Sequence, residues 1–168
     1  MWTELIKMAQ EASWEMSALE MPIVYHGGKG KVSEIDSEHL QQRDAGFYGK
    51  GFYVATNPKA TKGYGNILSK FYISPEAKIL KASLKPSEAP VGLLDAVYKY
   101  KYDKGIEAVK ARNKEDAFAE ELERIKTYPL DWKNAVDDFA AGNNYDIVFY
   151  NSGEIVIKNP SVVSSVKR

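Results

Sequence analysis

The chain has 168 residues, with 23 basic and 23 acidic side chains, no cysteine and two histidines. The even charge balance argues against nonspecific nucleic-acid binding, which needs a surplus of lysine and arginine. The absence of cysteine excludes disulfides and cysteine-ligated zinc, and two histidines are too few for a multi-histidine site, so we expect no metal.

The length favours a single domain covering residues 1–168. The N-terminal residues carry charges where a signal peptide has an unbroken apolar core. Nowhere does the sequence approach the roughly 20 consecutive apolar residues of a membrane helix. We therefore expect a cytoplasmic protein with no membrane partner.

The first half of the chain is predicted to contain both helices and strands. Apolar side chains at helical spacing predict an N-terminal helix, an extension over residues 2–20. A short strand is expected at 23–26, closed by a glycine-rich loop at 27–30, and a second strand at 51–55. A capping polar residue followed by proline then predicts a helix over 56–65.

The middle of the chain changes character. Two strands are expected at 67–73 and 78–84, followed by a block rich in Ala, Lys, Glu and Asp at 87–141. This block lacks a convincing strand pattern and is predicted to form three helices, divided near 103–105 and at Pro129.

The last helix is expected to end at a glycine cap at Gly142. Three strands follow at 145–150, 154–157 and 162–166, separated by turn residues. Because the helices lie between two groups of strands, the α+β class fits better than alternating βαβ units.

The glycines alone do not predict a nucleotide-binding fold. Gly27-Gly28-Lys29-Gly30 lacks the spacing of a P-loop, and Gly46, Gly49 and Gly51 lack that of a dinucleotide fingerprint.

Three short motifs nevertheless occur in order. They are Tyr25-His26-Gly27-Gly28, then Gly49-Lys50-Gly51-Phe52-Tyr53-Val54-Ala55 followed by Thr61 and Tyr64, and finally Gly153-Glu154-Ile155-Val156-Ile157. Together they resemble the His-Tyr-Glu signature of ADP-ribosyltransferases of the diphtheria-toxin and poly(ADP-ribose)-polymerase type. They most resemble the compact transferase domains of bacteriophages and other mobile elements, including those in polyvalent proteins.

This resemblance implies the ADP-ribosyltransferase fold, with two small, mainly antiparallel sheets around an NAD cleft. Residues 1–20 would be an N-terminal helix extension and residues 87–141 a helical insertion.

The resemblance also implies a role for each motif residue. Glu154 would bind a hydroxyl of the nicotinamide ribose and stabilise a cationic transition state, because a fixed carboxylate acts on charge that exists mainly there. Tyr53 and Tyr64 would stack on the nicotinamide ring. Gly27 would offer its backbone to the carboxamide, and Thr61 would add a hydroxyl.

Two further residues would hold the rest of the dinucleotide. His26 would hydrogen-bond the adenosine ribose, and Arg43, in a loop over residues 31–50 that covers the cofactor, would pair with the pyrophosphate. Taken one at a time, a turn glutamate, a core tyrosine and a structural histidine are the alternatives that these residues leave open.

The expected activity is transfer of ADP-ribose from NAD to a host macromolecule, with a host protein as the favoured acceptor and a nucleic acid as the alternative. Ser152 stands where arginine-modifying relatives carry Glu or Gln, which disfavours arginine as the acceptor. Two other hypotheses stay open: an NAD glycohydrolase, and a non-catalytic virion or binding module that retains the fold. The helical block at 87–141 is the natural candidate for recognising the acceptor.

Overall fold

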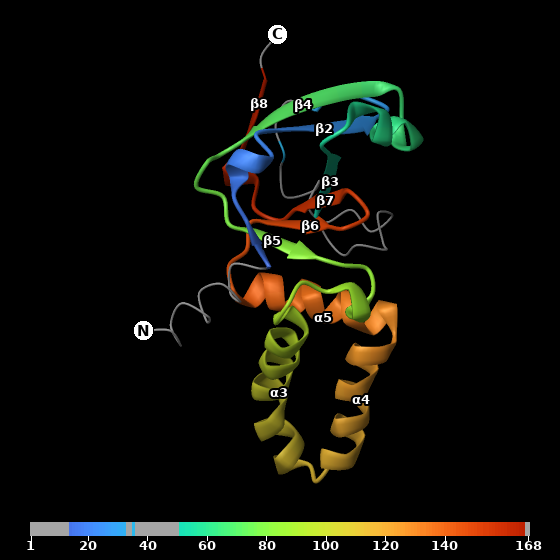
Figure 1. Cartoon of the computed structure of the whole chain (residues 1–168), viewed down its shortest axis with the longest axis vertical. Coiled ribbons are helices and arrows are strands. Elements are labelled where there is room, and N and C mark those ends of the chain that lie inside the picture. The colour runs from blue at the N-terminus through green and yellow to red at the C-terminus, as the bar shows by residue number, and fades with distance from the viewer. Residues whose placement is uncertain (1–13, 33–34, 36–50, 167–168) are drawn as a thin grey trace.

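The structure is a computed structural model that describes residues 14–32, 35 and 51–166. Within these residues it contains one eight-stranded mixed sheet and three α-helices. The three helices lie together at one end of the molecule (Figure 1). The predicted α+β class is confirmed.

The strands are β1 (Glu15–Met16), β2 (Ile23–Gly28), β3 (Phe52–Ala55), β4 (Ile67–Ile73), β5 (Ile79–Ala82), β6 (Ile147–Tyr150), β7 (Glu154–Ile157) and β8 (Val163–Ser165). The α-helices are α3 (Leu93–Ala111), α4 (Glu115–Thr127) and α5 (Pro129–Gly142). The short 3-10 helices are η1 (Ala18–Glu20), η3 (Pro58–Tyr64), η4 (Pro86–Glu88) and η5 (Pro160–Val162).

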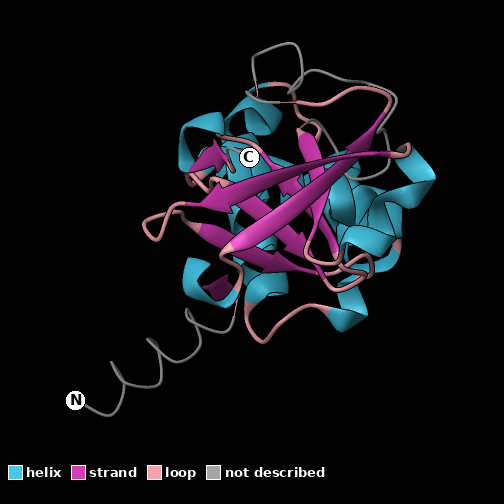
Figure 2. Cartoon of the chain, turned by 90° about the horizontal axis from the view of Figure 1, so that it is seen from above, coloured by secondary structure: helices cyan, strands magenta, loops and turns pink. Residues whose placement is uncertain are grey.

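The sheet has the strand order β1-β5-β6-β7-β3-β2-β4-β8, and only β5 and β6 among its described strands run parallel. Its strands cross one another at an angle when seen from above, as in a twisted sheet (Figure 2). Two separate sheets were predicted, and the structure has one. The reason is a single register pair, Tyr25 with Ala55, which joins β2 to β3.

Two hydrophobic cores lie on opposite faces of the sheet. On one face Tyr53, Val148 and Val156 pack with buried residues of the three helices. On the other face Phe52 and Ile155 pack with apolar residues of the N-terminal segment and of β4. This division follows from strand alternation, because neighbouring residues of one strand point to opposite faces.

The N-terminal helix prediction is wrong for the part of it that the structure describes. Glu15 and Met16 form a strand that pairs with β5, and a 3-10 turn follows. The turn is set by Ser17, whose hydroxyl accepts the Leu19 N–H, while the Glu20 carboxylate accepts the Ser17 N–H. This reciprocal capping starts a new turn at Ser17, so no helix continues through this position. The rest of the predicted helix lies outside the described residues.

The helical block contains three helices as predicted, but the first break is misplaced. Helix α3 runs through Gly105 and ends before Asn113, which has a left-handed φ of 54°. A Cβ at Gly105 would lie 2.6 Å from Phe118 Cζ, so this glycine allows α3 and α4 to pack closely. The break at Pro129 is confirmed.

Other boundaries differ in smaller ways. The strands predicted at 67–73 and 154–157 are confirmed, and the other predicted strands are present with different ends. The helix expected over 56–65 is the 3-10 helix η3, preceded by Asn57, whose side chain accepts the Lys59 N–H. Gly142 is the last residue of α5 and not a cap beyond it; a Cβ there would meet the Tyr100 ring.

Candidate functional site

The His26 side chain lies where β2 and β3 separate. Beyond the pair of Tyr25 with Ala55, these two described strands share no further register pair. The ring stacks on Phe52 with centroids 4.1 Å apart, and its Nδ1 is 2.9 Å from the Tyr53 carbonyl oxygen. Because a carbonyl only accepts, Nδ1 must carry the proton and donate it. In the neutral ring, Nε2 is then a hydrogen-bond acceptor.

Gly27 and Thr61 are in direct contact. A Cβ at Gly27 would lie 2.8 Å from Thr61 Cβ and 3.0 Å from its carbonyl carbon, and closer still to its carbonyl oxygen. The backbone of η3 therefore packs on β2 at a position that has no side chain. Thr61 is buried, and its hydroxyl donates to the Pro58 carbonyl at 2.7 Å. With that proton engaged, the Thr61 oxygen can only accept a further hydrogen bond.

Glu154 is the first residue of β7, and it is half-buried. It pairs in register with Ala55 of β3, and Ala55 pairs with Tyr25 of β2. Paired residues share a face of the sheet, as do residues two apart on one strand. Glu154, Tyr53 and Tyr25 therefore lie on the same face. Tyr53 is only 9% exposed and packs in the helix-side core.

A network of hydrogen bonds holds the turn before Glu154. The Asn151 N–H donates to the Ala82 carbonyl at 3.0 Å. Its side chain accepts the Leu84 N–H at 3.3 Å and donates to the Glu88 carboxylate at 2.8 Å. The turn is thus attached to the segment that follows β5, and this attachment fixes where β7 begins.

The predicted site residues do not all share one face of the sheet, because the His26 side chain stacks on Phe52, on the face opposite Glu154 and Tyr53. His26 donates a hydrogen bond to the backbone carbonyl of Tyr53. Gly27, the next residue in the chain, contacts Thr61. Glu154 lies one strand away, beside Ala55. The backbone of Tyr64 ends η3 but its side chain lies outside the described residues, as does all of Arg43.

Sequence reasoning missed three residues that support this arrangement: Phe52, on which His26 stacks; Tyr25, which connects β2 to the Glu154 row; and Asn151, which holds the turn. Asn151 had a local signal, because it belongs to an Asn-Ser-Gly turn, whereas Tyr25 and Phe52 belong to the sequence motifs without an assigned role. The other two depend on contacts between distant strands.

Metal and membrane features are absent from the part of the chain that the structure describes. It contains no cluster of three or more His, Asp or Glu side chains arranged to hold a metal ion. It also contains no helix long and apolar enough to cross a membrane.

One buried lysine lies near the end of β7 opposite Glu154. Lys133 of α5 is 3% exposed, and burial lowers its pKa from the ordinary 10.5. Asp137 opposes this shift and Lys158 adds to it. Asp137 also forms an ion pair with Lys158, the residue after β7. These charges connect α5 to the sheet.

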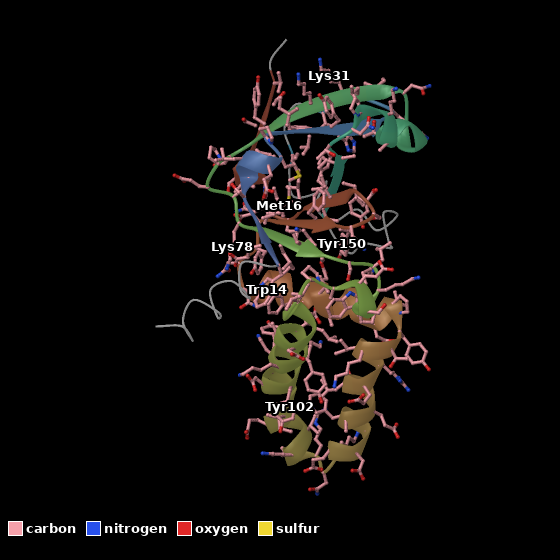
Figure 3. The ribbon with its side chains drawn as sticks, viewed as in Figure 1. Trp14, Met16, Lys31, Lys78, Tyr102 and Tyr150 are labelled. Atoms are coloured by element: carbon pink, nitrogen blue, oxygen red, sulfur yellow. The ribbon has the colours of Figure 1, made fainter. Side chains whose placement is uncertain are left out.

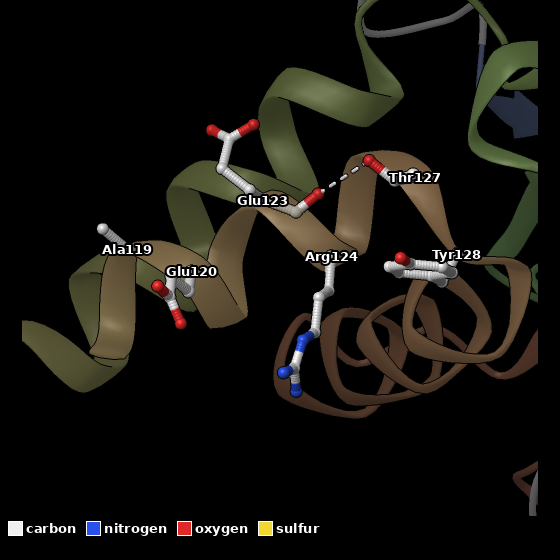
Figure 4. Close-up of a pocket in the computed structure, with 6 residues that line it drawn as sticks. All are labelled: Ala119, Glu120, Glu123, Arg124, Thr127 and Tyr128. Atoms are coloured by element: carbon white, nitrogen blue, oxygen red, sulfur yellow. Dashed lines mark hydrogen bonds between the residues drawn. The ribbon is translucent and has the colours of Figure 1, made fainter. Parts of the chain in front are cut away.

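A pocket of about 450 Å³ lies along α4, far in the chain from these residues (Figure 4). Its lining residues are Ala119, Glu120, Glu123, Arg124, Thr127 and Tyr128. The Thr127 hydroxyl is bonded to the Glu123 carbonyl at 3.2 Å. None of the predicted site residues lines this pocket.

A scan against protein-family models finds no matching family, and a search of curated proteins finds no match. Among solved structures, the chain is similar to one described as the crystal structure of an anti-CRISPR protein. The identity is 17% and the TM-score 0.43, over 92% of this chain and 98% of that chain. A likeness at this level assigns neither a family nor a function to this chain.

Proposed function

We propose that this chain is an ADP-ribosyltransferase that transfers ADP-ribose from NAD to a protein. The observation that carries the proposal is the convergence of three motifs that are far apart in sequence. The His26 ring bonds the Tyr53 backbone carbonyl from the Phe52 face, at the point where β2 and β3 separate, and Glu154 begins the strand next to β3, on the opposite face, which Tyr53 shares. The ADP-ribosyltransferase fold itself is part of the proposal.

The NAD-binding roles are consistent with the hydrogen-bond groups of the described residues. Nε2 of neutral His26 accepts, which suits a donating ribose hydroxyl of the adenosine. The Thr61 oxygen accepts, which suits the N–H of the nicotinamide carboxamide. Gly27, with no side chain, leaves its backbone open to close approach. In the proposal, Tyr64 and an edge of Tyr53 stack on the nicotinamide, and Arg43 pairs with the pyrophosphate.

The proposed reaction breaks the bond between C1′ of the ribose and the nicotinamide nitrogen. The bonding electrons leave with nicotinamide, which departs as a neutral molecule, and positive charge develops on the sugar. The Glu154 carboxylate stabilises this charge, which is largest in the transition state. A nucleophile of the acceptor then bonds to C1′ and releases its proton to water. The reaction needs only NAD, the acceptor, the Glu154 carboxylate and water, which takes up the proton.

The experiment that tests the proposal follows both products. The full chain is incubated with NAD labelled in its adenylate phosphate, with and without a bacterial lysate as a source of acceptors. Transfer predicts nicotinamide release together with labelled protein, which mass spectrometry can locate. Nicotinamide release with free ADP-ribose alone would make the protein a glycohydrolase. No release under either condition would refute the enzyme proposal.

A further inference from the structure

The described residues at the end of the molecule that carries β2 and β4 have an unbalanced charge. Residues 22–32 and 51–75 contain five lysines and no aspartate or glutamate, although the whole chain is neutral. The side chains of Lys29, Lys31, Lys59 and Lys70 are exposed. Lys31 lies beside β4, at the opposite end of the molecule from Tyr102 of α3 (Figure 3).

The lysines at this end have no acidic ion-pair partner among the described residues, whereas three lysines of the helices do. Ion pairs join Lys99 to Asp103, Lys101 to Asp138 and Lys126 to Glu123. Because no described acidic neighbour balances the lysines at the β2 and β4 end, their charges favour a positive potential over this surface. An anionic partner would be attracted there.

An apolar stripe accompanies this charge. Leu68, Lys70 and Tyr72 of β4 point to one face, with Leu68 43% and Tyr72 48% exposed. Their register partners on β2, Gly27, Tyr25 and Ile23, share that face. We call the surface formed by Ile23, Tyr25, Leu68, Lys70 and Tyr72 the β4 face. An exposed apolar centre with charge around it is the usual anatomy of a protein interface.

The β4 face continues directly from the candidate site. Glu154, Ala55, Tyr25 and Lys70 form one row across β7, β3, β2 and β4. Three steps between paired strands separate the ends of the row by about 15 Å. A partner bound on the β4 face would therefore lie within reach of Glu154.

Resting on the proposed function, we propose that the β4 face is the docking surface for the acceptor, and that the acceptor is a protein with an acidic surface around an apolar centre. The composition favours a protein over a nucleic-acid strand. Although Tyr25 and Tyr72 carry rings, the aliphatic Ile23 and Leu68 beside them suit an apolar protein surface better than a base. The described basic residues on this side are lysines, without the arginines suited to bidentate phosphate contacts.

The test uses the full chain and three fluorescent probes: a short peptide of Glu, Leu and Gly, the same peptide with Gln for Glu, and a short oligothymidylate. Fluorescence anisotropy gives the dissociation constants. Two double variants carry the same change of net charge: Lys31→Glu with Lys70→Glu on the docking side, and Lys99→Glu with Lys110→Glu on α3 as the control.

Wild type and the α3 control should bind the Glu peptide most tightly, and the docking variant about tenfold more weakly, since two exposed charge contacts are reversed. The affinity should fall between about 50 mM and about 500 mM salt. Tyr72→Ser should also weaken binding of the Glu peptide, as an apolar centre requires. Equal binding by both double variants, no binding by wild type, or a preference for oligothymidylate would each overturn the inference.

Nicotinamide release from NAD in water is measured on the same samples, because it reports the NAD site and not the docking surface. Absence of release in the wild type would refute the proposed function, whatever the peptides do. Normal release with unchanged peptide binding in the docking variant would refute the docking surface alone.

Discussion

Replacing Gly27 with alanine adds one methyl group where β2 meets η3. The new Cβ would lie 2.8 Å from Thr61 Cβ, whereas ordinary contacts begin at 3.4 Å, so the two segments must separate by at least about 0.6 Å. The nearest atoms belong largely to the backbone of η3, so a change of rotamer cannot relieve the overlap. Overpacking of this kind lowers the free energy of unfolding by about 1–3 kcal/mol.

The same displacement moves the Thr61 hydroxyl away from the proposed carboxamide position. Because a misplacement of about 1 Å can lower an enzymatic rate by roughly 100-fold, nicotinamide release should fall by about 10- to 100-fold. A thermal melt gives the stability, with a midpoint lowered by about 3–10 °C, and chromatography of released nicotinamide gives the rate.

Gly30→Ala is the matched control, since a Cβ there meets no atom within 4 Å. It should leave both the melting midpoint and the rate of nicotinamide release near their wild-type values. Gly27→Ala with wild-type stability and rate would refute the packing argument at this position.

Two further predictions concern the ends of β7 and the core beneath it. Asn151→Ala removes side-chain bonds to Leu84 and Glu88, and should lower the free energy of unfolding by about 1 kcal/mol and slow nicotinamide release without changing NAD affinity by calorimetry. Asn159→Ala loses comparable side-chain hydrogen bonds just after the other end of β7 and should keep the wild-type rate of nicotinamide release. An equal loss of rate in both variants would show that Asn151 has only a structural role. In the folded state the pKa of Lys133 lies below its unfolded value of 10.5. Between these two pKa values the unfolded state binds more protons than the folded state, so the free energy of unfolding rises with pH. Urea unfolding should therefore show wild type gaining stability relative to Lys133→Met as the pH enters the alkaline range, and parallel curves would contradict this.

Local sequence signals predicted the elements whose limits are set locally. The strand at 67–73 is rich in isoleucine and aromatic residues and ends before Pro75, and that at 154–157 follows a turn-forming glycine, so both were located correctly. The helical spacing of the N-terminus failed at Glu15 and Met16 because these residues pair with β5, far along the chain. Propensity carries no information about a partner that distant.

The same distinction between local signals and distant strand pairing applies to the candidate site. The order of the motifs predicted that His26, Tyr53 and Glu154 line one cleft, whereas the structure shows only that they stand on the adjacent strands β2, β3 and β7, with the His26 side chain on the face opposite Glu154. The motif order did not predict the row that connects Glu154 to Tyr25 and Lys70, because register across strands is set by tertiary pairing. The continuity of the β4 face with the site therefore became visible only in the fold.

The most direct test of the central claim compares wild type with Glu154→Gln. The substitution keeps the size of the side chain and removes its negative charge. If Glu154 acts on the charged transition state, calorimetry should show nearly unchanged NAD affinity, while nicotinamide release falls by about 10²–10³-fold. Glu76→Gln, an exposed glutamate in the turn between β4 and β5, should retain the wild-type rate. Wild-type turnover in Glu154→Gln would contradict the account and return Glu154 to the role of a half-buried residue at the start of a strand.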